Sequence, residues 1–120
     1  MMEAKELRIG NWVKISHPDI DKFVYNEMVV IDFVQMVDKK NKYIYDPIPI
    51  TEEILIKAGF KSIGDEYLFD NDIIYYLNEF SWNMGDISYN GSDDWFKCEY
   101  VHDLQNFYFA LTGEELELEL

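Results

Sequence analysis

Apolar and polar positions form their clearest pattern over residues 101–120. Apolar residues recur there at three- and four-residue spacing, which places them on one face of a helix. They are Val101, Leu104, Phe107, Tyr108 and Leu111. Asp103 suits the first turn of this helix, and Gly113 suits its C-terminal end. Glutamate and leucine then alternate over residues 115–120, which predicts a strand with one buried face. The pattern predicts a helix that covers a sheet, followed by one more strand.

Shorter patterns in the first sixty residues predict strands and one short helix. Residues 6–15 indicate a strand broken by a turn or bulge at Gly10 and Asn11. Residues 23–37, which contain the run MVVIDFVQMV, predict a strand that forms an antiparallel hairpin with residues 43–45. Residues 51–59 predict a short helix, which a threonine caps and a glycine ends.

Two hairpins are predicted in the second half of the chain. Residues 67–69 and 73–77 flank the turn Asp-Asn-Asp, and residues 87–89 and 95–100 flank the loop at residues 90–94. No repeat or linker divides the chain, so we expect a single domain over residues 1–120. The fold class is α+β: a mainly antiparallel twisted sheet or small barrel, with one short central helix and one longer C-terminal helix packed on the sheet.

The composition predicts a packed domain and indicates the cellular compartment of the protein. Of the 120 residues, 48% are hydrophobic and 17% aromatic, which is more than a disordered chain carries. No apolar run approaches the roughly 20 residues that span a bilayer, and the first residues lack the apolar core of a signal peptide. Cys98 is the only cysteine, which suits a reducing compartment. We therefore expect a cytoplasmic protein without a membrane partner.

The charge of the chain is strongly asymmetric. The formal net charge is −14. Residues 1–61 contribute −1, whereas residues 62–120 contribute −13, because Lys97 is their only basic side chain. Such a surface repels nucleic acid and favours a basic protein partner. The alternative is that the acidity serves only solubility.

Candidate chemical groups are few. Cys98 and His102 could offer two metal ligands or a nucleophile pair, but zinc needs further ligands, and the neighbouring Glu99 and Asp103 raise the pKa of the thiol. The aspartates lack the spacing of an EF-hand, and no phosphate-binding glycine loop occurs. The sequence therefore predicts no metal, no cofactor and no enzymatic activity, although a small hydrolase with an unrecognised site stays open.

Three segments carry a family resemblance: LRIGNWV at residues 7–13, ITEEILIKAGF at 50–60 and VHDLQNFYFALTGEEL at 101–116. Together they resemble a family of small uncharacterised proteins from phages, prophages and other mobile elements of Bacteroidota. The resemblance leaves residues 64–100 unmatched. It implies an origin in a mobile element and transfers no catalytic residue.

These observations lead to a functional hypothesis. We expect a small acidic interaction protein that inhibits a nucleic-acid-handling host defence protein, of the anti-CRISPR type, by binding its basic surface as a nucleic-acid mimic. Hairpin tips project furthest, so the expected contacts are Asp65, Glu66, Asp70, Asp72, Asp86, Asp93, Asp94 and Trp95. The predicted C-terminal strand also offers an edge for a homodimer. The alternative is an accessory or structural protein without inhibitory activity.

Overall fold

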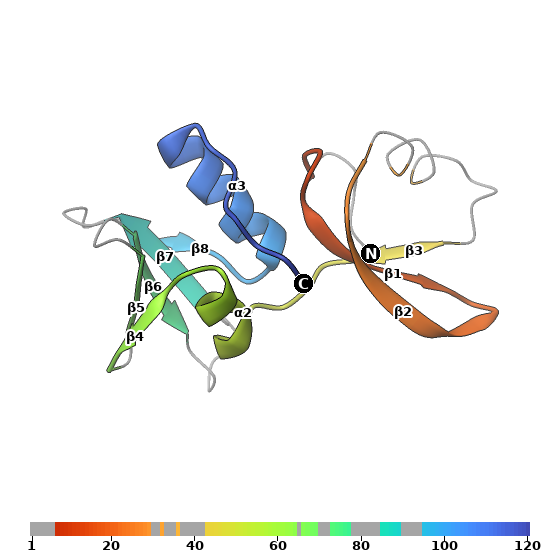
Figure 1. The fold of residues 1–120 in the computed structure, drawn as a ribbon, viewed down its shortest axis with the longest axis horizontal. Helices are drawn as coiled ribbons and strands as arrows, with labels where there is room; N and C mark the ends of the chain where they lie inside the picture. The colour runs from red at the N-terminus through yellow and green to blue at the C-terminus, as the bar shows by residue number, and fades with distance from the viewer. Residues whose placement is uncertain are drawn as a thin grey trace. The chain divides into compact units, whose positions relative to one another are not determined.

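A computed structural model describes residues 7–29, 32, 36, 43–64, 66–69, 73–77, 85–89 and 95–120. The chain divides into two compact units, Met1–Ile48 together with Leu120, and Pro49–Glu119 (Figure 1). The described residues form antiparallel sheets of three and five strands, with a short helix and a C-terminal helix. The predicted α+β class is confirmed, but the sheets do not close into a barrel. The single domain over residues 1–120 stays a prediction.

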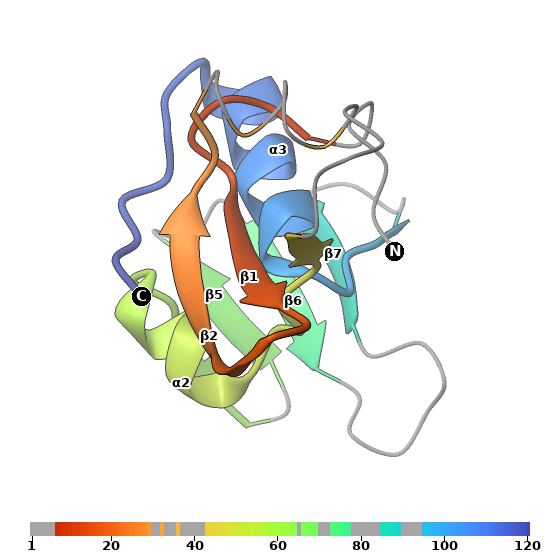
Figure 2. The same ribbon diagram turned by 90° about the vertical axis from the view of Figure 1, so that its right-hand side faces the viewer.

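The first unit is built on a three-stranded antiparallel sheet with the order β2-β1-β3. Its strands are β1 (Trp12–His17), β2 (Ile20–Glu27) and β3 (Ile44–Asp46). β1 and β2 form a hairpin around Pro18 and Asp19, as Figure 2 shows. The core on one face of this sheet consists of Leu7, Val13, Met28 and Tyr45, with Ile15 and Met36 packed against it.

The turn before β1 depends on two residues of the LRIGNWV segment. Gly10 has φ +93°, a conformation that suits glycine. Its N–H donates to the Met28 carbonyl at 2.8 Å, and the Met28 N–H donates to the Asn11 carbonyl at 2.8 Å. The buried Asn11 side chain accepts a hydrogen bond from the Arg8 N–H at 2.6 Å. The predicted turn or bulge is confirmed, and both residues have a structural role here.

The strand predicted within residues 23–37 is confirmed for residues 23–27, which belong to β2, and is wrong for the described residues after Glu27. β2 ends at Glu27, and Asp32 and Met36 have helical backbone. Asp32 explains the change, because its carboxylate accepts the Val29 N–H at 2.9 Å while its own N–H donates to the Val29 carbonyl at 3.0 Å. This capping geometry starts a helical turn in spite of the β-branched residues around it. The predicted hairpin is also wrong, because β3 pairs with β1.

Tyr45 links this turn to β3 and gives a pH-dependent prediction. Its hydroxyl donates to Asp32 at 3.2 Å. Burial first, and then the charge and hydrogen bond of Asp32, raise the pKa of Tyr45 to about 12. Because the unfolded value is about 10, the neutral phenol stabilises the fold fully below pH 10, and this contribution is lost as the pH rises towards about 12. Urea melts of Tyr45→Phe should therefore show a shallower loss of stability across this window than the wild type. Equal slopes would contradict this role for Tyr45.

The second unit combines a five-stranded antiparallel sheet with two helices. In chain order its elements are α2 (Glu52–Lys57), β4 (Lys61–Ile63), β5 (Glu66–Phe69), β6 (Ile73–Leu77), β7 (Gly85–Tyr89), β8 (Phe96–Lys97) and α3 (Val101–Thr112). The strands pair in sequence order, so both predicted hairpins are confirmed. The helix at residues 51–59 is also confirmed: Thr51 caps it by accepting the Ile54 N–H, and Gly59 follows it with φ +102°.

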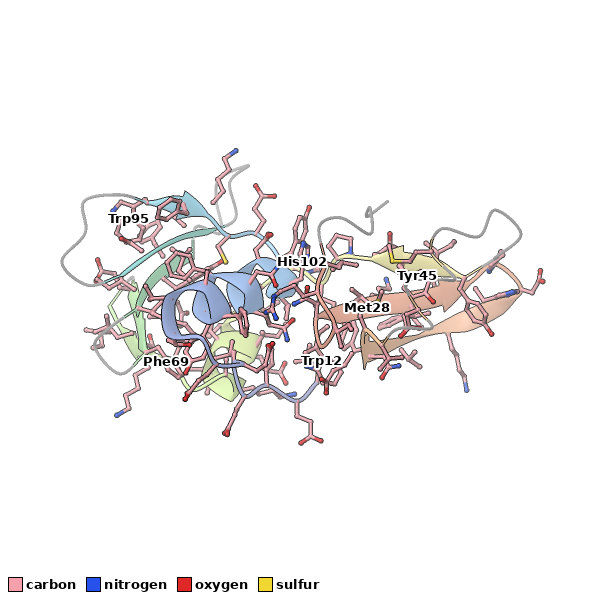
Figure 3. The ribbon with its side chains drawn as sticks, turned by 90° about the horizontal axis from the view of Figure 1, so that it is seen from above. Trp12, Met28, Tyr45, Phe69, Trp95 and His102 are labelled. Atoms are coloured by element: carbon pink, nitrogen blue, oxygen red, sulfur yellow. The ribbon has the colours of Figure 1, made fainter. Side chains whose placement is uncertain are left out.

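The helix α3 packs on one face of this sheet through aromatic contacts. The ring of Tyr108 lies 5.3 Å from Phe69 of β5, and that of Phe107 lies 5.9 Å from Phe96 of β8. In Figure 3, Phe69 and Trp95 lie on opposite sides of α3. The predicted burial of Leu104 is confirmed, but that of Leu111 is wrong, because the last turn of the helix is exposed on all sides.

Two polar residues of α3 are buried, which the sequence pattern did not predict. His102 and Gln105 have exposed fractions of only 4% and 2%. Asp103 accepts the Tyr100 N–H at 3.2 Å, which satisfies a backbone donor at the start of the helix. Gly113 ends the helix with φ +76°, as predicted.

The C-terminal alternation predicts burial correctly but secondary structure incorrectly. Leu116 is buried, Leu118 and Leu120 are half-buried, and the glutamates between them are exposed. Residues 115–120 form no strand with the described part of the chain. A ladder needs a neighbouring strand, which alternation by itself does not supply. The homodimer expected through this segment stays a prediction.

Candidate functional site

Strand pairing brings two of the predicted contact residues into one row across the five-stranded sheet. Glu66 pairs with Tyr76, Tyr76 pairs with Asp86, and Asp86 pairs with Lys97. These four residues are called the cross-strand row. Adjacent strands lie about 4.8 Å apart, so Glu66 and Asp86 are separated by about 10 Å with Tyr76 between them.

The cross-strand row lies on the face of the sheet that α3 does not cover. The neighbouring row of Tyr67, Tyr75 and Ile87 is buried, and Phe96 in the same row contacts α3. Because side chains alternate between faces, the cross-strand row points the other way. Glu66 and Lys97 are exposed, whereas Asp86 is half-buried. The row can therefore meet a partner at the surface.

Charge on this face is balanced among the described residues. Lys97 stands directly beside Asp86, and Lys61 is two residues from Ile63, which pairs with Glu66. Two lysines thus accompany two carboxylates. The cross-strand row alone does not present an acidic surface, which the prediction from net charge did not anticipate.

The remaining predicted residues divide into one that the structure describes and five that it does not. Trp95 directly precedes β8 and is 47% exposed, beside the 49% exposed Phe96. Both side chains are accessible at the edge of the sheet, although the Phe96 ring also contacts Phe107 of α3. The positions outside the described residues are Asp65, Asp70, Asp72, Asp93 and Asp94.

The strand ends show where the two acidic hairpin turns attach to the sheet. Phe69 pairs with Ile73, and Ile73 pairs with Tyr89, so the chain leaves β5 and β7 at the same end of the sheet. Glu66 lies three residues back along β5, about 10 Å from that end. The structure therefore places the cross-strand row apart from the ends that carry the predicted tips.

The C-terminal segment displays more exposed carboxylates than the cross-strand row. The sequence analysis did not choose this segment as a contact surface. Residues 99–120 contain six acidic residues and no lysine or arginine. Glu114, Glu115, Glu117 and Glu119 are exposed, while Leu116 between them is buried. The buried leucine fixes which side of the segment faces inward, so the carboxylates are held outward. The alternation itself was the signal that could have identified them.

Cys98 and His102 do not form a reactive pair in this geometry. The Cys98 side chain is fully buried. Burial first, and then the charges of Asp103 and Asp86, raise the pKa of its thiol well above the ordinary value. The thiol is therefore protonated and shielded from reactants. Across the described ranges, no group of three or more His, Cys, Asp or Glu side chains is placed to hold a metal ion.

Comparisons of the chain with protein-family models, with curated proteins and with solved structures find no match. In the part of the chain that the structure describes, neither helix has the length and apolar character needed to cross a membrane.

Proposed function

We propose that this protein is a small acidic interaction protein of the cytoplasm that inhibits a nucleic-acid-handling host defence protein, of the anti-CRISPR type, by binding its basic surface. The carboxylates would occupy a groove of lysine and arginine side chains that otherwise holds nucleic-acid phosphates. Duplex DNA carries about one negative charge per 1.7 Å of axis, so a competitor needs closely spaced charges.

The observation that carries this proposal is the outward display of the C-terminal glutamates. Glu114, Glu115, Glu117 and Glu119 are exposed in a segment without basic residues. Trp95 and Phe96 add two accessible aromatic side chains in the same unit. Aromatic side chains commonly supply the desolvated contacts from which interface affinity comes, while charges steer the encounter. The resemblance to proteins of mobile elements supports a host defence protein as the target.

Two variants with equal charge changes test which carboxylates act. In the tip variant, Asp70, Asp72, Asp93 and Asp94 become Asn; in the tail variant, Glu114, Glu115, Glu117 and Glu119 become Gln. Each removes four charges. DNA cleavage by purified CRISPR effector nucleases is measured with and without each protein, and association is followed at several salt concentrations.

The proposal expects inhibition by the wild type, and an association rate reduced by about tenfold with a flatter salt dependence for at least one variant. The pair Glu66→Gln and Asp86→Asn is the internal control, because Lys61 and Lys97 already balance these charges. The proposal would be contradicted if the wild type did not inhibit cleavage. It would also be contradicted if neither four-charge variant changed the association rate.

One observation favours the alternative of an accessory or structural protein whose acidity serves only solubility. The cross-strand row mixes carboxylates with lysines, as an ordinary solvated surface does. Under this alternative, both four-charge variants lose solubility at high concentration, and the wild type leaves nuclease activity unchanged.

A further inference from the structure

The strand β2 stands at the edge of its sheet in the part of the chain that the structure describes. In the order β2-β1-β3 its strand neighbour is β1 (Figure 2). Its eight residues make it the longest strand described. Phe23, Val24 and Tyr25 are exposed by 50%, 57% and 43%. A long edge strand with accessible apolar side chains on both faces is a template for pairing with another strand.

The backbone of β2 offers a regular set of hydrogen-bonding groups on its outer side. Met28 directs its N–H and carbonyl towards Asn11 and Gly10, on the side of β1. These directions alternate along an antiparallel strand. Asn26 and Val24 therefore also face β1, whereas the backbone groups of Phe23, Tyr25 and Glu27 face away from it.

We propose that β2 pairs antiparallel with β2 of a second copy of this chain, around a two-fold axis at Tyr25. Tyr25 then faces Tyr25 of the second copy, and Phe23 faces Glu27 in both directions. Each of these pairs exchanges two backbone hydrogen bonds. The two three-stranded sheets continue as one six-stranded sheet. The inference concerns the first unit and does not rest on the proposed function.

Charge disfavours two of the nearby symmetric registers, and an axis at Asn26 would leave only residues 25–27 of β2 paired. A two-fold axis at Val24 would place residues 21 and 27 opposite each other, and an axis at Phe23 would do the same for residues 19 and 27. Both are pairs of acidic residues, which oppose pairing when they lie directly across a ladder. The axis at Tyr25 avoids both repulsions.

The same register creates a favourable charge pair, and this pair identifies the occupant as a second copy. The Lys14 Nζ lies 4.4 Å from the centre of the Phe23 ring. Lys14, Phe23, Tyr25 and Glu27 share one face, because Lys14 pairs with Tyr25 and side chains alternate. With Glu27 of the second copy opposite Phe23, its carboxylate comes beside Lys14. The two-fold axis repeats this contact, so the edge is complementary to itself.

Cross-linking through one introduced cysteine in the full chain tests the register. Under mild oxidation, Tyr25→Cys should form a disulfide-linked dimer, because directly opposed Cα atoms lie about 5.5 Å apart, within disulfide range. Val24→Cys should not, since its own counterpart is displaced along the strand. The wild type is the background control, because its Cys98 is buried. Preferential cross-linking of Val24→Cys, or equal yields from both variants, would overturn the register.

Charge exchange tests the proposed contact in solution. Sedimentation equilibrium of the wild type should show a monomer–dimer equilibrium. Glu27→Lys should weaken the dimer by about tenfold, and adding Lys14→Glu should restore it. Circular dichroism verifies that each variant is folded, as expected for changes at the exposed Glu27 and the half-buried Lys14. A monomer at every concentration, or a dimer that Glu27→Lys leaves unchanged, would overturn the proposal.

Discussion

Gly85→Ala should lower the free energy of unfolding by about 3 kcal/mol, at the upper end of what an extra methyl group costs in a packed core. Gly85 begins β7, and its backbone has no left-handed conformation to explain the glycine. A Cβ atom there would overlap the hydroxyl and ring of Tyr75 and lie 2.9 Å from the Cys98 carbonyl oxygen. The residue is small because an aromatic ring of the core occupies the space above it.

The Tyr75 ring cannot move away from the new methyl group without a large cost in free energy. Its side chain is fully buried, and its hydroxyl donates to the Cys98 carbonyl at 2.6 Å. Moving the ring would break this bond and leave a buried carbonyl unsatisfied, which costs about 1–3 kcal/mol. The loss therefore combines steric strain with a missing hydrogen bond.

Urea denaturation of Gly85→Ala and Gly64→Ala separates packing from backbone conformation. Gly64 has φ +61°, and no atom of the described residues lies within 4 Å of the position that a Cβ atom would take there, so its alanine variant should lose only about 1 kcal/mol for the left-handed conformation. A Gly85→Ala loss no larger than that of Gly64→Ala would show that Tyr75 can move aside freely.

Features controlled by short stretches of sequence were predictable. Thr51 and Gly59 start and end α2 as expected, because capping depends on neighbouring backbone groups. The hairpins on either side of residues 70–72 and 90–94 also formed as predicted. The resemblance, by contrast, remains a prediction, since the comparisons match no family.

Features that depend on distant partners were not predictable from periodicity. The β-branched residues around Asp32 favour a strand, yet its carboxylate caps Val29 and accepts a hydrogen bond from Tyr45, thirteen residues away. Gly85 carries no local pattern, because its constraint comes from Tyr75 and Cys98. Local propensity loses to tertiary contacts at such positions.

The candidate site likewise combines features that short stretches of sequence predict with features that depend on distant partners. The exposure of the C-terminal glutamates could be predicted, because their alternation with leucine is visible in the sequence. The balance of charge on the cross-strand row could not, because Lys97 meets Asp86 only through the register of β7 and β8. Net charge therefore predicts an acidic protein without locating its acidic surface.

The proposed function and the proposed dimer depend on different units. The glutamates of residues 114–119 belong to Pro49–Glu119, whereas β2 belongs to the unit that contains Met1–Ile48. Variants of the glutamates should change partner association without changing sedimentation, and Glu27→Lys should do the reverse. Either proposal can fail while the other stands.

Leu104→Ala should lower the free energy of unfolding by about 2–5 kcal/mol, the cost of emptying a leucine-sized volume in a packed core. Leu104 is only 1% exposed, in the part of α3 that follows the buried Val101.

Leu111→Ala is the matched control on the same helix: it deletes the same atoms from a side chain that is 44% exposed, so its loss should stay within about 0.5 kcal/mol. Both variants keep a good helix former, so propensity does not separate them. Urea melts followed by circular dichroism compare the two. A loss below about 1 kcal/mol for Leu104→Ala, or equal losses for both variants, would mean that α3 contributes little to the core and that its aromatic contacts with β5 and β8 do not anchor it.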